Sequence, residues 1–170
     1  MKTNIVLIGM PGSGKSTVGV VLAKKLGYQF MDVDLVIQKK YGKLLWQIIK
    51  EQGNQGFMQI ESKVNQEIQT QNTVIAPGGS VVLEEEAMQY LKKIAIIVYL
   101  KIEYSELEQR LGNLTTRGVV LEEGATLKDL YDLRTPLCEQ YADIIIEENK
   151  RKLYETVEAI WKEVYPVLFL

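Results

Sequence analysis

"IVLIGMPGSGKSTVGVVLAKKLG", residues 5–27, joins a short apolar run to a helical pattern through a turn rich in glycine. The turn, GMPGSGKS at 9–16, fits the pattern G-x-x-x-x-G-K-[ST]. Glycines let backbone N–H groups curl around phosphate oxygens, and the N-terminus of the next helix adds the positive end of its dipole. A turn that merely joins two elements is the alternative. Because the motif lies between a predicted strand at 4–8 and a predicted helix at 16–26, we interpret it as a phosphate-binding loop.

This loop supplies candidate ligands for a nucleotide and its metal ion. Lys15 is placed to reach the β- and γ-phosphates, and the Ser16 hydroxyl is placed to bind Mg²⁺. We therefore expect ATP and Mg²⁺ as cofactors. The expected nucleotide-binding residues of the loop are Gly12, Ser13, Gly14, Lys15, Ser16 and Thr17.

The rest of the chain alternates apolar strands with helical patterns. We expect strands at 28–34, 73–79, 94–100 and 142–148, and helices at 35–52 (broken near Gly42), 57–70, 84–92, 103–111, 126–141 and from 153 to a stop at Pro166. Strands that are apolar throughout indicate a parallel sheet covered on both faces. The expected fold class is α/β, a three-layer α/β/α P-loop NTPase fold with a five-stranded parallel sheet. The 170 residues are expected to form a single kinase domain, 1–170.

Composition excludes several other classes of function. The net charge of −2, without a run of Lys or Arg, argues against a nucleic-acid partner, and no apolar run is long enough to predict a membrane span. The single cysteine, Cys138, rules out an internal disulfide and suits a reducing cytoplasm, where we expect the protein. Because histidine is absent, any proton transfer must use carboxylates, lysine or water.

Two aspartates end the second predicted strand. Asp32 and Asp34 are two residues apart, so on a strand their side chains point to the same face. Beside a phosphate-binding loop, one can hold Mg²⁺ and the other can orient a substrate hydroxyl for attack. The alternative is that Asp34 caps the helix that follows. The positions alone favour neither interpretation.

Three more features are candidates for ligand contacts. PGGS at 77–80 follows a strand and lets backbone N–H groups approach a ligand, unless it is a plain turn. Residues 112–125 carry three glycines and little periodicity, which predicts a mobile lid from which Arg117 closes over the phosphate. Arg134 stands just before Thr135–Pro136, which favours extended backbone. The alternative is that Arg117 is a solvated loop charge and that Arg134 forms a structural salt bridge.

A small P-loop domain with a lid indicates a small-molecule kinase. The base-reading N/T-K-x-D segment of a GTPase is absent, and a motor would need a larger domain. A nucleotide-binding module without catalysis stays possible, since it would keep the loop and lose the acceptor site. A nucleoside monophosphate kinase is less favoured because it would carry more arginines than the four here, Arg110, Arg117, Arg134 and Arg151.

Taken together, these elements resemble shikimate kinase, a P-loop enzyme that phosphorylates the 3-hydroxyl of shikimate with ATP. The resemblance covers nearly the whole chain. Its matching segments, in order, are GMPGSGKSTVG, LAKKLGYQFMDVD, GNQGFMQIE, VIAPGGS, EQRL, TTRG and LRTPLCEQYAD. It implies a monomer of the shikimate pathway, which leads to chorismate and the aromatic amino acids. It also implies a substrate-binding helical segment at about 34–70 and a lid at about 112–125.

The resemblance assigns roles residue by residue. Phosphate contacts fall to Gly12, Gly14, Lys15 and the lid residue Arg117, Mg²⁺ contacts to Ser16 and Asp32, and the adenine contact to Arg110. Acceptor contacts fall to Asp34 at the hydroxyls, Gly78 and Gly79 through their backbone, and Arg134 at the carboxylate. The residues expected to carry catalysis are Lys15, Asp34 and Arg117.

The chain departs from the family mainly on the acceptor side. A second carboxylate-binding arginine of the family falls at Met58, which leaves Glu61, one helical turn on, without that cation. A hydrogen bond to a charged group contributes roughly 1.5–3 kcal/mol, or about ten- to a hundredfold in binding. The family's glycine triplet here ends in Ser80. Shikimate is still the expected acceptor, either bound weakly or with compensation by another cation such as Lys63, and a different small hydroxylated acceptor without a carboxylate is the alternative.

Overall fold

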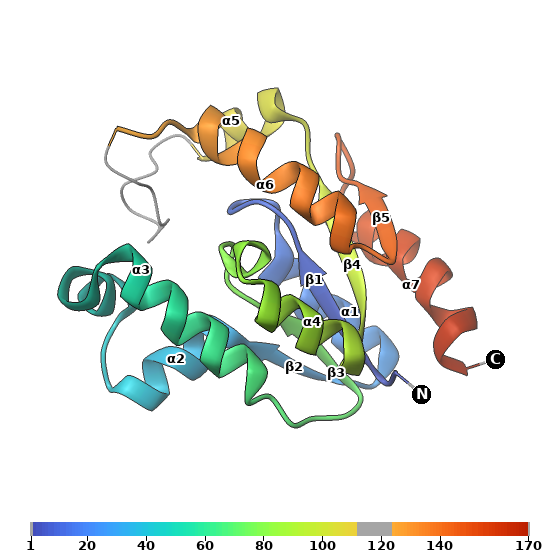
Figure 1. The fold of residues 1–170 in the computed structure, drawn as a ribbon. Coiled ribbons are helices and arrows are strands. Elements are labelled where there is room, and N and C mark those ends of the chain that lie inside the picture. Colours follow the sequence, from blue (N-terminus) through green and yellow to red (C-terminus); the bar gives the residue numbers. More distant parts are fainter. Residues whose placement is uncertain (1, 112–123, 170) are drawn as a thin grey trace.

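A parallel β-sheet forms the centre of the computed structural model, which describes residues 2–111 and 124–169. Its five strands lie in the order β2-β3-β1-β4-β5, and every pairing is parallel (Figure 1). The strands are β1 (Asn4–Ile8), β2 (Gln29–Asp32), β3 (Thr73–Ala76), β4 (Ala95–Lys101) and β5 (Ile144–Glu147). The helices are α1 (Lys15–Leu26), α2 (Val33–Tyr41), α3 (Leu45–Gln66), α4 (Glu85–Ile94), α5 (Tyr104–Leu111), α6 (Leu127–Tyr141) and α7 (Leu153–Phe169), with a 3₁₀ helix, η1 (Val81–Leu83). The predicted fold class is confirmed.

Strand β1 is buried on both faces, which explains its continuous apolar sequence. Ile5 and Leu7 pack with residues of α1 and α7, whereas Val6 and Ile8 pack with residues of α3, α4 and α6. The sheet thus lies between two helical layers. A smaller cluster around Met10 joins α5 and α6 above the end of β1.

The strand registers place three loops at one edge of the sheet. Val6 of β1 pairs with Ile75, and Asp32 at the end of β2 pairs with Ala76. The phosphate-binding loop after β1, the end of β2 and the glycine turn after β3 therefore lie close together. Ligands of open parallel sheets bind at this carboxyl edge.

The helices that cover this edge break where the sequence predicts. Gly42 ends α2 as predicted, and non-helical backbone at Gly53 separates the two helical segments expected on either side of residues 53–56, which together make up α3. Gly53 has φ 70° and ψ 175°, a left-handed backbone that interrupts the helical geometry. The kink separates the first turns of α3 from the half that carries Phe57 and Glu61.

Two prolines lie inside helices, and both contradict the sequence rules applied to them. Helix α7 continues through Pro166 to Phe169, where the ring of Phe169 lies 6.4 Å from that of Tyr28. Helix α6 contains Pro136, so Arg134 is helical and the expected extended backbone is wrong. Packing outweighs the lost hydrogen bond in both helices.

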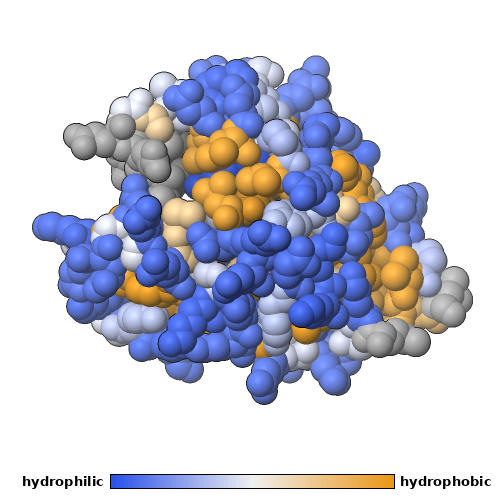
Figure 2. All heavy atoms as spheres, viewed as in Figure 1, coloured by the Kyte–Doolittle hydropathy of each residue, from blue (hydrophilic) through white to orange (hydrophobic). Residues whose placement is uncertain are grey.

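The face seen in Figure 2 is mostly hydrophilic, with a group of apolar side chains at its centre beside α6. Leu133 of α6 is 55% exposed. No helix formed by the described residues is long and apolar enough to cross a membrane. The predicted lid lies outside the described residues except for 124 and 125.

Pro166→Ala should stabilise the protein. Alanine restores the N–H that can bond to the carbonyl of Lys162, one turn earlier in α7. Proline inside a helix costs about 3 kcal/mol relative to alanine, and we expect about 1 kcal/mol or more here because residue 166 lies in the last turn. Urea unfolding measures the gain, with Val167→Ala as the control. An unchanged free energy of unfolding would show that α7 ends before Pro166 in solution.

Candidate functional site

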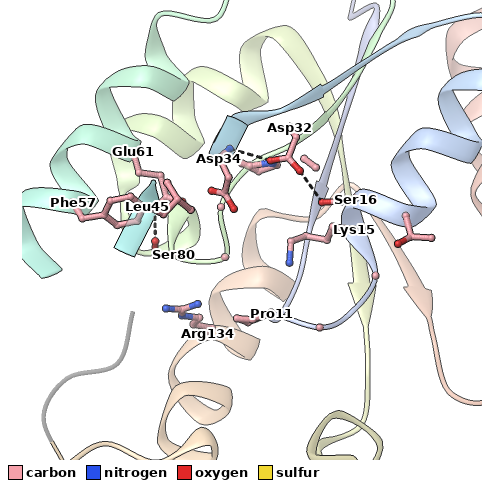
Figure 3. A pocket seen from close by; sticks show the side chains of 17 residues that line it. Pro11, Lys15, Ser16, Asp32, Asp34, Leu45, Phe57, Glu61, Ser80 and Arg134 are labelled. Atoms are coloured by element: carbon pink, nitrogen blue, oxygen red, sulfur yellow. Dashed lines mark hydrogen bonds between the residues drawn. The ribbon is translucent and has the colours of Figure 1, made fainter. Parts of the chain in front are cut away.

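A cavity of about 260 Å³ opens at the carboxyl edge of the sheet (Figure 3). Ligand pockets are typically of roughly 300–1,000 Å³, so this one suits a small ligand. Side chains from α1, α2, α3 and α6 and from the glycine turn point into it. The predicted site residues that line the cavity are Gly12, Gly14, Lys15, Ser16, Thr17, Asp32, Asp34, Gly78, Gly79 and Arg134.

The phosphate-binding loop begins α1 as the motif predicts. Gly14 has φ 91° and caps the helix, a conformation that favours glycine. The Lys15 ammonium donates hydrogen bonds to the carbonyls of Gly9 and Met10, both at 2.9 Å. Burial lowers the pKa of Lys15 to about 8, so the side chain stays mainly charged at neutral pH. Ser13 is buried, and its N–H donates to the Met10 carbonyl at 3.1 Å.

The two carboxylate oxygens of Asp32 accept hydrogen bonds from two different elements. Its Oδ1 accepts the N–H of Asp34 at 3.0 Å and so caps α2, while its Oδ2 accepts the Ser16 hydroxyl at 3.0 Å. The alternative that Asp34 is the cap is wrong, and so is the strand geometry expected for the pair: β2 ends at Asp32, and Asp34 lies in the first turn of α2. The Asp32 carboxylate satisfies one of the N–H groups that the first turn of α2 would otherwise leave unpaired.

Ser16 and Asp32 form a fitting site for Mg²⁺. They offer a hydroxyl and a carboxylate oxygen beside the phosphate-binding loop. Mg²⁺ prefers oxygen ligands and commonly binds through one or two protein groups together with phosphates and water. Across 2–111 and 124–169, no three His, Cys, Asp or Glu side chains are grouped so that they could hold a metal ion. A site that is completed by nucleotide phosphates agrees with that observation.

Asp34 still reaches the cavity, although from a helix rather than a strand. Burial raises the pKa of its carboxyl to about 6, with a further contribution from Asp32, while Lys15 opposes the rise. The carboxyl is thus mostly ionised above pH 7. It can accept a hydrogen bond from a hydroxyl group in the cavity.

The glycine turn after β3 is the floor of the cavity, and it has no room for side chains. A Cβ on Gly78 would overlap Oε1 of Glu61 and lie 3.3 Å from Oδ1 of Asp34. A Cβ on Gly79 would lie 3.1 Å from Nη1 of Arg134 and 3.3 Å from Cγ of Pro11. Carboxyl groups thus flank Gly78, and a guanidinium flanks Gly79.

Sequence reasoning did not place Glu61 and Ser80 in the site. The Ser80 hydroxyl donates to Oε2 of Glu61, and both side chains are buried. Burial raises the pKa of Glu61 to about 7; the Ser80 hydrogen bond opposes this, Asp34 adds to it and Arg134 opposes it. A signal was available, because the spacing of Phe57 and Val64 predicts a buried stripe on which residue 61 falls.

Arg134 brings a cation from α6 to the cavity wall. It is 2% exposed, and burial lowers the pKa of its guanidinium to about 10, against the attraction of Glu61. The group therefore stays charged at all physiological pH values. A buried fork of donors is suited to bind a carboxylate.

Among the described residues, three predicted ones do not line the cavity: Ser13, Met58 and Arg110. Met58 is half-buried on α3, one turn before Glu61. Arg110 of α5 pairs with Glu106, and its Nη1 lies 4.0 Å from Oε2 of Glu148. Arg117 lies outside the described residues.

Comparisons with known proteins agree on one family. The model of the shikimate kinase family matches residues 11–165. The chain is similar to the shikimate kinase of Thermodesulfovibrio yellowstonii, with 39% identity over 163 residues and 94% of each chain covered. It is also similar to that of Nostoc punctiforme, with 40% identity over 166 residues, 96% of this chain and 91% of the relative.

Solved structures extend the likeness to three dimensions. Shikimate kinase from Acinetobacter baumannii in complex with shikimate matches with a TM-score of 0.90 and 30% identity, over 100% of this chain and 97% of the other. Deoxyadenosine kinase from M. mycoides matches with a TM-score of 0.55 and 17% identity, which shows the fold alone.

Gly78→Ala should destabilise the protein more than Gly79→Ala. The methyl group at 78 would displace the buried Glu61 carboxyl, and overpacking of this kind costs about 1–3 kcal/mol. The methyl group at 79 meets only the edges of Pro11 and Arg134, each beyond 3.0 Å. Thermal unfolding of both variants measures the difference. Equal unfolding temperatures would mean that Glu61 moves aside at little cost.

Proposed function

This chain belongs to the shikimate kinase family and phosphorylates shikimate with ATP as the phosphate donor, and we propose that the reaction takes place in the cavity at the carboxyl edge of the sheet. One observation carries the proposal: Lys15, Asp34 and Arg134, from three different helices, converge on the Gly78–Gly79 turn. They supply, in one small space, a contact for phosphate, a contact for a hydroxyl and a contact for a carboxylate.

On the nucleotide side, the loop backbone and Lys15 would hold the phosphates. The Lys15 ammonium already lies inside the loop on the Gly9 and Met10 carbonyls, and it would turn from these to phosphate oxygens. Ser16 and Asp32 would hold Mg²⁺, whose charge would offset that of the phosphates. Phosphoryl transfer depends mostly on positioning and charge neutralisation.

On the acceptor side, Asp34 would orient the attacking hydroxyl. Its carboxylate accepts the hydroxyl hydrogen, and its pKa of about 6 suits it to take the proton as the oxygen bonds to phosphorus and the bond to ADP breaks. Backbone groups of Gly78 and Gly79 would support the ring, and Arg134 would bind the carboxylate at the other end. The hydroxyl is thereby aimed at the phosphate-binding loop.

The alternatives are less well supported. A nucleotide-binding module without catalysis would have lost acceptor contacts, whereas Asp34 and Arg134 both line the cavity. Met58, in place of a second carboxylate-binding arginine, is the one argument for a different hydroxylated acceptor. The solved shikimate kinase in complex with shikimate, 30% identical over the full chain, favours shikimate.

The remaining assignments are also proposals. We propose that Mg²⁺ is the metal ion, that 112–125 is the lid with Arg117 at the phosphates, and that Arg110 lies against adenine. The segment 34–70 would bind the acceptor. We further propose a cytoplasmic monomer that acts without a nucleic-acid or membrane partner.

Arg134→Lys should raise the KM for shikimate about tenfold or more while it leaves the KM for ATP nearly unchanged. Lysine keeps the charge but loses the fork of donors that matches a carboxylate. A coupled ADP-release assay with Mg-ATP and wild-type enzyme tests the function, and the variant tests the contact. Arg151→Lys, an exposed arginine away from the cavity, is the control. An equal rise in both KM values would argue against a carboxylate contact.

Met58→Arg should lower the KM for shikimate by about tenfold, since it adds a cation one turn from Glu61. Met58→Leu controls for the change of shape. Wild-type turnover of shikimate at low KM with no gain in the variant would show that Arg134 suffices. Turnover of shikimate by the variant alone would mean that the wild-type acceptor is another compound.

A further inference from the structure

The Glu61 carboxyl forms a buried wall behind the acceptor cavity. Its Oε2 accepts the Ser80 hydroxyl, and Oε1 has no hydrogen-bond partner within the part of the chain that the structure describes. Oε1 occupies the place that a side chain on Gly78 would take, and Gly78 lines the cavity. The charge of the Glu61 carboxyl therefore acts directly beneath the position proposed for the acceptor.

Charged groups from several elements face this carboxyl. They are Asp34 of α2, Arg134 of α6, Lys15 of α1 and Glu84 at the start of α4. Met58, one turn earlier on α3, adds no charge. With all groups ionised, the cavity is lined by three negative side chains, Asp32, Asp34 and Glu61, and by two positive ones, Lys15 and Arg134. The described cavity wall therefore carries one more negative than positive charge before the acceptor enters.

An acceptor that enters as a carboxylate adds a further negative charge to this set. Unbalanced charge away from water is costly, and the cost falls if a nearby acid becomes neutral. Glu61 can do so in place, because the Ser80 hydroxyl can donate to a carboxylate and can also accept from a carboxylic acid. A lysine or arginine partner has donors only and would hold Glu61 in the charged form.

Resting on the proposed function, we propose that binding of the anionic acceptor is coupled to uptake of a proton from solvent by Glu61, and that Ser80 holds the carboxyl in place in both states. The Glu61 carboxylate takes one proton from the buffer and becomes a neutral carboxylic acid, and no other bond forms or breaks. Glu61 and Ser80 are thus positioning residues: they act on the acceptor through the Gly78 turn and the local charge.

The direction of the pH dependence follows from linkage. The pKa of Glu61 is about 7 in the free protein, and an added anion raises it further. Well below pH 7 Glu61 is already neutral, so acceptor binding takes up no proton. Above pH 7 binding must draw a proton to Glu61, so affinity for the acceptor falls as pH rises.

Titration calorimetry with shikimate alone, in buffers of different ionisation enthalpy, measures this uptake. For the wild type we expect roughly half a proton or more per shikimate bound at pH 7.5 and almost none at pH 5.5. Glu61→Gln should bind shikimate without uptake at either pH. Ser80→Ala should move the uptake to higher pH, because it removes a hydrogen bond that stabilises the charged form. Arg151→Gln should behave as the wild type.

Each other result has a distinct meaning. Shikimate bound without proton uptake at pH 7.5 overturns the coupling and leaves the proposed function intact. Uptake that persists in Glu61→Gln assigns the proton to another group and also overturns it. If the wild type neither binds shikimate nor turns it over, both the proton coupling and the proposed function are wrong. Should Glu61→Gln fail to fold, Met58→Arg replaces it: a guanidinium one turn away should keep Glu61 charged and abolish uptake.

Discussion

The parallel pairing of β1 between β3 and β4 is the constraint on which the site depends. It sets the phosphate-binding loop level with the glycine turn after β3, because both loops leave the sheet at the same edge. Pairing of β2 with β3 then brings Asp32 and the start of α2 to that edge. The helices add side chains to a frame that backbone hydrogen bonds have already fixed, and this frame makes a small cavity precise enough for phosphoryl transfer.

The second requirement is that five charged side chains share a small space, namely Lys15, Asp32, Asp34, Glu61 and Arg134. Each would be costly alone, but the carboxyl groups and the cations partly offset one another. Gly78 and Gly79 make the arrangement possible, since any side chain there would separate the groups. Burial of these groups shifts their pKa values: those of Asp34 and Glu61 are raised, and those of Lys15 and Arg134 are lowered.

Local chemistry explains what could be predicted from the sequence. The phosphate-binding loop and the five strands are visible because their signals lie within short segments, as in residues 4–16. The Asp32–Asp34 prediction was right about the cavity and wrong about the backbone, because a helix cap competes with strand extension. The burial of Glu61 could be predicted from the helical stripe of Phe57 and Val64, but its contact with Ser80 could not, since the two residues lie 19 positions apart and meet only through folding. Pro136 shows that packing can override a local rule.

The divided use of Asp32 constrains how this protein can diverge. One oxygen begins the helix that presents Asp34, and the other meets Ser16 at the nucleotide side. Selection for nucleotide binding and selection for acceptor binding therefore act on the same residue, and a substitution of Asp32 disturbs both binding sites. Change in acceptor preference is less constrained at positions such as 58, which is not part of the cavity lining, and 80, which lines the cavity but makes no contact with the Ser16–Asp32 pair.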